Sequence, residues 1–171
     1  MPAIIDRLRA SLTAFEANPA AAVTRPTATA ALNNGHARIS SGPFNWDADL
    51  GRAVGGENLA PSPTAYLLGA LAGCAVAFLC DTLAPLFEVT LDDVQATASC
   101  RADLGGLLGI KGRSPALEDV RLEIVVQSPS RGESVDAMLD AWRRRCPIFL
   151  ALITSTAVRL DTRVASGAVT R

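Results

Sequence analysis

The sequence is poor in charge, in aromatic residues and in histidine. Charged residues make up 19% and aromatic residues 5% of the 171 positions, and the formal net charge is -1. A nucleic-acid surface needs an excess of clustered cations, and the three arginines at 143–145 are too short a run to supply one. His36 is the only histidine, and no two cysteines stand closer than six residues, so zinc-ligand spacings are missing as well. We therefore expect neither nucleic acid nor a metal as a partner.

Other absences narrow the class of protein further. Four cysteines are too few for a disulfide scaffold in a chain of this length. The single histidine disfavours Cys–His and Ser–His nucleophiles, and the phosphate-binding G-x-x-x-x-G-K-[ST] motif does not occur. The N-terminus alternates charged with apolar residues, unlike a secretory signal. We expect a cytoplasmic, reduced protein in which a functional cysteine is reactive rather than structural.

One long hydrophobic run is present, at residues 65–80, and it contains a cysteine. This segment could be a membrane span, or it could be a buried helix whose cysteine is either an inert core residue or a shielded reactive thiol. Sixteen residues fall short of the roughly 20 that a span needs, so we expect no membrane insertion. The run predicts the buried helix of a soluble protein, from about Thr64 to Leu83, with Ser62 or Thr64 as its N-cap. Gly69 and Gly73, four apart, allow another element to approach closely.

The remaining segments alternate between helical and strand periodicity. Residues 33–35, "NNG", predict a hairpin turn, and 105–115 predict a turn or loop. Helices are expected at 3–17, 130–145 and from Cys146 to 156, and strands at 22–32, 36–40, 44–46, 86–103, 116–128 and 157–164. This order predicts one α+β domain with antiparallel sheets.

The cysteines differ in their predicted surroundings. Pro147 favours a helix start, which makes Cys146 an N-cap beside the positive end of a helix dipole and behind the arginines. Both features favour a thiolate, although cysteine is also common as an inert buried residue, and the two interpretations stay open. Cys74 lies ten residues into an apolar helix, where burial raises its pKa unless a cation reaches it. Cys80 and Cys100 are expected to be core residues.

Two motifs together resemble the OsmC/Ohr family of thiol-dependent organic-hydroperoxide reductases. They are "PSPTAYLLGALAGC", ending at Cys74, and the distant "CPIFLAL", starting at Cys146. The family pattern is a Pro-rich lead to a buried helix carrying the first cysteine, followed by a Cys-Pro some sixty or more residues later. The resemblance covers about residues 27–163. It suggests an OsmC-like domain at 25–171, preceded by an amphipathic helical extension at 1–24.

The resemblance implies an intertwined homodimer with antiparallel sheets, a buried central helix and active sites at the dimer interface. Cys74 would attack an organic hydroperoxide and become a sulfenic acid, and Cys146 would condense with it to a disulfide. A dithiol, often a protein-bound lipoyl group, would then reduce that disulfide. Such enzymes need no metal, haem or flavin, so no cofactor is expected.

The sequence departs from the family in the groups that activate the first cysteine. An arginine normally pairs with that thiolate and is held by a glutamate nine or ten residues ahead of the cysteine, where this chain has Ala65 and Thr64. Glu57 is the nearest acid. Arg38 and Arg52 both precede the motif, and Arg52 in its Gly-rich loop is preferred as the arginine that would pair with the Cys74 thiolate. The predicted catalytic set is therefore Cys74, Cys146, Arg52 and Glu57.

Two other functions compete with the peroxidase. One is an OsmC-like protein without peroxidase turnover that binds a hydrophobic ligand or senses redox state. The missing glutamate favours it, whereas the two retained cysteines favour the enzyme. The other is a structural dimer whose cysteines only pack. An arginine within hydrogen-bond reach of the Cys74 sulfur would separate the enzyme from the binding protein.

Overall fold

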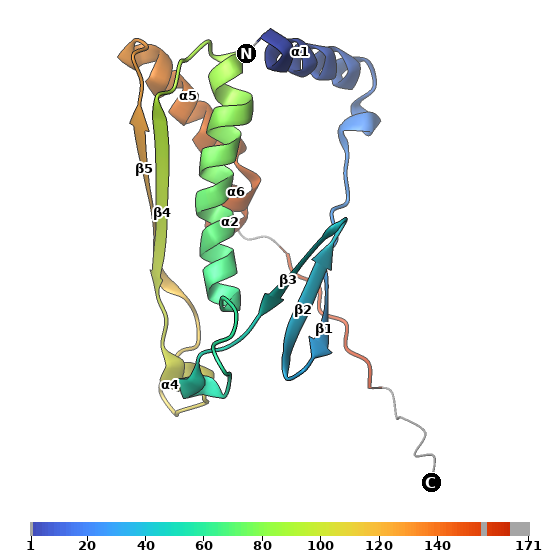
Figure 1. Ribbon diagram of the computed structural model, residues 1–171, viewed down its shortest axis with the longest axis vertical. Coiled ribbons are helices and arrows are strands. Elements are labelled where there is room, and N and C mark those ends of the chain that lie inside the picture. The colour runs from blue at the N-terminus through green and yellow to red at the C-terminus, as the bar shows by residue number, and fades with distance from the viewer. Residues whose placement is uncertain (1, 155–156, 165–171) are drawn as a thin grey trace.

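The computed structural model describes residues 2–154 and 157–164. A three-stranded and a two-stranded antiparallel sheet lie on either side of one long central helix (Figure 1). The predicted α+β class with antiparallel sheets is confirmed. The elements are α1 (Pro2–Ala17), η1 (Pro19–Ala22), β1 (Thr29–Asn33), β2 (His36–Ser41), β3 (Phe44–Ala48), η2 (Arg52–Val54), α2 (Pro63–Phe78), η3 (Leu79–Leu83), α3 (Ala84–Leu86), β4 (Asp93–Arg101), α4 (Leu104–Leu107), β5 (Glu118–Gln127), α5 (Gly132–Arg145) and α6 (Pro147–Ile153).

The first sheet is a meander of β1, β2 and β3. Asn34 and Gly35 connect β1 to β2 with φ of 49° and 89°, the left-handed geometry that a two-residue hairpin turn needs. The predicted turn is therefore confirmed. The helix α1 precedes this sheet, also as predicted, but Leu12 and Phe15 on its apolar side remain more than 40% exposed.

The second sheet is the hairpin of β4 and β5, which pair from Asp93 with Gln127 to Arg101 with Glu118. The predicted strand at 86–103 is wrong over its first residues. Helix continues to Leu86, and Glu88 then takes a positive φ of 55°, which ends it before β4 starts at Asp93. Part of the predicted loop at 105–115 is likewise a single helical turn, α4.

The central helix begins where the sequence predicts it. The Ser62 hydroxyl accepts the Ala65 N–H at 3.2 Å as the N-cap. The helix runs through α2 into η3, a π-helical turn, and ends at Leu86 in α3. This continuous 24-residue helix contains an 18-residue window of mean hydropathy 1.9, so by length and composition alone it could cross a membrane. The argument from the length of the apolar run was therefore wrong, but the expectation of no membrane insertion is not contradicted, because core helices of soluble proteins pass the same test.

One face of this helix forms the core. Ala75, Leu79 and Leu83 are fully buried against Met138 and neighbouring side chains of α5. The opposite face is open. Ala65, Gly69, Gly73 and Ala77, each four residues from the next, are exposed, and no atom approaches within 4 Å of a Cβ built on either glycine. The predicted burial of the helix thus holds for one face within this chain.

The C-terminal part follows the prediction up to α6. Helix α5 presents Val135, Met138 and Trp142 inward, and α6 ends at Ile153. Residues 155–156 of the predicted helix lie outside the described residues. The predicted strand at 157–164 is wrong within this chain, because the segment has no strand pairing among the described residues and Val158 and Val164 are 89% and 100% exposed.

Candidate thiol site

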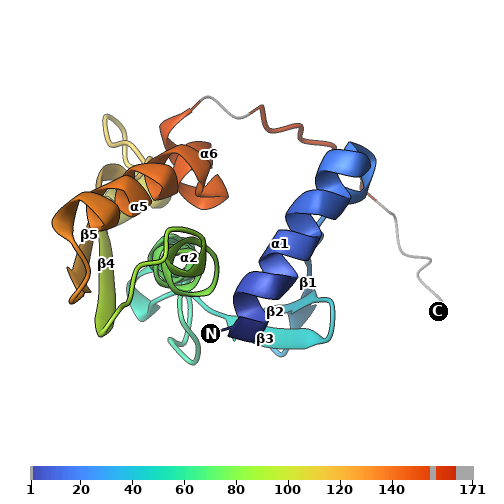
Figure 2. The same ribbon diagram turned by 90° about the horizontal axis from the view of Figure 1, so that it is seen from above.

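The fold brings Cys74 and Cys146 together from positions 72 residues apart. Their Sγ atoms are 3.1 Å apart, so one S–H donates to the other sulfur. Cys74 lies on α2 and contacts Cys146 at the start of α6. The helix α6 packs beside α2 (Figure 2). A disulfide has an S–S length of about 2.0 Å, so oxidation of this pair to a disulfide would require the two sulfurs to approach by only about 1 Å.

Local sequence explains why Cys146 is held so firmly. Its extended backbone joins α5 to α6, and Pro147 occupies the first helical position of α6. The Cys146 N–H donates to the Trp142 carbonyl at 2.9 Å, and the Cys146 carbonyl accepts the Leu150 N–H at 3.0 Å. The side chain is completely buried. Cys146 is therefore a rigid partner for the half-buried Cys74.

The surroundings of Cys74 disfavour its thiolate within this chain. Burial, with added contributions from the hydrogen bond and the charge of Cys146, raises the pKa of Cys74 to about 11, while the backbone N–H of Ile148 opposes this shift. Sequence analysis predicted a raised pKa for this thiol. At neutral pH Cys74 in the single chain is thus a protonated thiol, and an additional cation is needed to activate it.

Cys80 and Cys100 lie apart from this pair. Cys80 is on the π-helical turn, where burial and then the charges of Asp81 and Asp93 raise its pKa. Cys100 is on β4. Both are half-buried free thiols, and neither hydrogen-bonds another described residue through its sulfur. Neither belongs to the hydrophobic core cluster, so their predicted role as core residues stays a prediction.

The structure does not bring the predicted arginine or glutamate to the thiols. Arg38 donates to both carboxylate oxygens of Asp47, at 3.1 and 3.0 Å. Arg52 lies on η2 and is exposed, and Glu57 lies in the loop that follows. Among the described residues, none of these side chains hydrogen-bonds Cys74 or Cys146.

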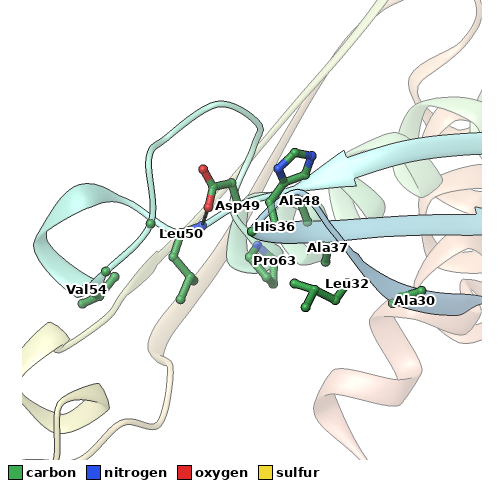
Figure 3. Close-up of a pocket in the computed structure, with 13 residues that line it drawn as sticks. Ala30, Leu32, His36, Ala37, Ala48, Asp49, Leu50, Val54 and Pro63 are labelled. Atoms are coloured by element: carbon green, nitrogen blue, oxygen red, sulfur yellow. Dashed lines mark hydrogen bonds between the residues drawn. The ribbon is translucent and has the colours of Figure 1, made fainter. Parts of the chain in front are cut away.

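A buried carboxylate that sequence analysis missed organises this loop. Asp49 is 7% exposed and accepts the N–H groups of Leu50, Glu57 and Leu59 at 2.8, 3.1 and 3.0 Å. Figure 3 shows the bond from Leu50. These bonds, that from Leu59 above all, lower the pKa of Asp49. An aspartate directly before a Gly-rich loop is the available sequence signal. Asp49 thereby fixes the loop that carries Arg52.

A cavity of about 520 Å³ adjoins this loop rather than the thiols. Its walls are mostly small apolar side chains, with Asp49 and the half-buried His36 among them (Figure 3). Neither cysteine lines it. Within residues 2–154 and 157–164, no cluster of three His, Cys, Asp or Glu side chains is arranged to hold a metal ion.

Comparisons with known proteins agree on the fold. The family model described as "OsmC-like protein" matches residues 55–161. An OsmC-like protein from Mycoplasma pneumoniae is 21% identical, with a TM-score of 0.62 over 75% of this chain and 87% of that one. An organic hydroperoxide resistance protein from Elizabethkingia anophelis is 16% identical, with a TM-score of 0.58 over 78% and 91%. An OsmC-like protein of unknown function from Vibrio cholerae is 11% identical, with a TM-score of 0.56 over 77% and 96%. No curated protein matches the sequence.

Proposed function

The chain belongs to the OsmC-like protein family, and from this we propose that it is a thiol-dependent peroxidase that reduces organic hydroperoxides. The observation that carries the proposal is the 3.1 Å separation of the Cys74 and Cys146 sulfurs, which suits a two-cysteine cycle. Solved proteins with this fold include organic hydroperoxide resistance proteins, which makes the same chemistry the natural candidate here.

The proposed cycle uses only the two thiols, a hydroperoxide and a dithiol. The Cys74 thiolate attacks the distal peroxide oxygen, the O–O bond breaks, and the alkoxide leaves and takes up a proton as the alcohol. Cys74 is then a sulfenic acid. The Cys146 sulfur displaces its hydroxyl group as water and forms the disulfide. An external dithiol, for which a lipoyl group is our candidate, takes the two oxidising equivalents by thiol–disulfide exchange.

The cation that activates Cys74 is proposed to come from a second subunit. Arg52 is our candidate, with Glu57 orienting it and Arg38 as the alternative. A guanidinium beside the thiolate would lower the Cys74 pKa from its value of about 11. The existing pair of Arg38 with Asp47 favours Arg52, whose side chain makes no ion pair among the described residues.

The open face of α2 supports a homodimer. Ala65, Gly69, Gly73 and Ala77 form a flat apolar stripe on a helix of high hydropathy, and this stripe is exposed in the single chain. Small side chains spaced four apart allow two helices to approach closely. A second copy covering this stripe would also bury Cys74, the residue after Gly73, at the subunit interface.

We expect the protein to sediment at twice its 17.8 kDa chain mass. Gly69→Leu places a large side chain in the stripe and should weaken the dimer at least tenfold, measured by analytical ultracentrifugation over a concentration series. Gly132→Leu is the matched control, since Gly132 also has open space around its Cβ but lies on α5. A wild-type monomer, or equal weakening by both variants, would refute the α2 interface.

The direct test of the peroxidase is intact mass with non-reducing peptide mapping after one equivalent of oxidant. Cumene hydroperoxide should produce a Cys74–Cys146 link within seconds, and hydrogen peroxide should produce it more slowly. Because the thiols are already in contact, linkage requires no large rearrangement. Thiols that stay reduced, or that link slowly and without preference, would reject the peroxidase.

A ligand-binding or redox-sensing protein without peroxidase turnover is the second candidate. The Cys74 pKa of about 11 favours it, as do Thr64 and Ala65 at the positions where the family commonly has glutamate. In that case the thiols would change state slowly, as a signal. A cytoplasmic location fits either candidate and remains part of the proposal, because both need reduced thiols in the resting state.

A further inference from the structure

A second cavity, of about 270 Å³, is lined by residues of α5, α6 and β5. Figure 2 shows α5 next to both β5 and α6. It is separate from the thiols, since neither Cys74 nor Cys146 lines it. Trp142 and Phe149, which stand on either side of Cys146 in the sequence, form part of its wall with ring centroids 5.2 Å apart. The lining residues are Leu122, Ile124, Leu139, Trp142, Arg143 and Phe149.

The lining combines an apolar interior with one charged side chain. Five of the six residues are aliphatic or aromatic, and the sixth is Arg143. The Arg143 side chain is 69% exposed and pairs with Asp140 at 3.2 Å, three residues earlier on the same helix. An exposed pair of this kind is weak, so an anion at the cavity mouth can compete with Asp140 for the guanidinium.

We propose that this cavity binds a small aliphatic carboxylate, with its chain against the apolar wall and its carboxylate on Arg143. The volume equals about nine water molecules at ~30 Å³ each, which suits a chain of about six to eight carbons. A cationic amphiphile would meet repulsion from Arg143, and a neutral one would lack the ion pair. The proposal does not depend on the peroxidase, because it involves neither cysteine.

The probe is octanoate, titrated into the full-length protein. Trp46→Phe leaves Trp142 as the only tryptophan, so its fluorescence and its indole N–H resonance report on this cavity. We expect one saturable site per chain. Octanoate should bind about three- to fivefold more tightly than octanamide, through the exposed ion pair. It should bind about sixteenfold more tightly than hexanoate, since each of its two additional methylenes contributes about fourfold when buried.

Two arginine variants separate a specific ion pair from a general effect of charge. Arg143→Gln should abolish the preference for octanoate over octanamide, whereas Arg144→Gln, an equal charge change at the next position, should preserve it. Leu122→Phe fills the cavity and should remove binding of both probes. The proposal is overturned by the absence of saturable binding, by equal affinity for octanoate and octanamide, or by equal losses in the two arginine variants.

Discussion

Cys74→Ser is expected to abolish consumption of cumene hydroperoxide, lowering the rate at least about a thousandfold to the uncatalysed background. A serine hydroxyl is not ionised at neutral pH and cannot form a sulfenic acid, so the first bond of the cycle is never made. The measurement is peroxide consumption with excess dithiol present.

Cys146→Ser should give a different defect. Without a resolving thiol, Cys74 consumes one equivalent of hydroperoxide and stops as a sulfenic acid, which a sulfenic-acid-specific reagent would trap. Cys100→Ser is the control for the number of thiols, and it should turn over normally because Cys100 lies on β4, away from the pair. Full activity in Cys74→Ser would refute the assignment.

Arg52→Gln is expected to slow the reaction of Cys74 with hydroperoxide about fiftyfold at pH 7. An adjacent guanidinium lowers a thiol pKa by up to about three units. Starting from about 11, such a shift raises the thiolate fraction at pH 7 about a thousandfold. The thiolate also becomes about twentyfold less nucleophilic as its pKa falls. The net gain in rate is therefore about fiftyfold, and Arg52→Gln should lose it.

The pH dependence of Cys74 alkylation should show the direction in which Arg52 shifts the pKa of this thiol. Below its pKa Cys74 is a protonated thiol and unreactive, so its alkylation rate rises with pH and levels off above the pKa. The midpoint should move upward in Arg52→Gln, towards about 11, and stay at the wild-type value in Arg38→Gln. If the wild-type midpoint already lies near 11, no cation reaches the thiol. The protein would then be the binding or sensing protein rather than a peroxidase.

Local sequence patterns correctly predicted those structural features that depend only on neighbouring residues in the sequence. The "NNG" turn needs only residues that tolerate positive φ, and the Ser62 cap needs only a hydroxyl three residues ahead of a free N–H. The alternation at 157–164 was read as a strand, yet a strand also needs a neighbour to pair with, and this chain provides none among the described residues. A pattern of side chains cannot reveal that partner.

The site shows the same division between local and distant causes. The direction of the Cys74 pKa shift was predicted from its apolar helix, and the structure adds the contributions of Cys146 to it. The pairing of Cys74 with Cys146 came from the family resemblance, because no periodicity relates residues 72 positions apart. Asp49 was missed because its partners are backbone N–H groups, which every residue carries. Which arginine serves Cys74 was left open, since that depends on contacts across the fold or between subunits.

The π-helical turn at Leu79–Leu83 determines the direction in which Cys74 projects from the central helix relative to the residues that follow the turn. Such a turn holds one residue more than an α-helical turn, and each residue advances a helix by about 100°. The part of the helix that carries Cys74 is therefore rotated by about that angle relative to the part that anchors Leu83 and Ala84 in the core. Deleting a single residue from this turn would restore regular α-helical winding and rotate Cys74 away from Cys146. The alignment of the two sulfurs thus depends on an irregularity in winding that begins five residues beyond Cys74.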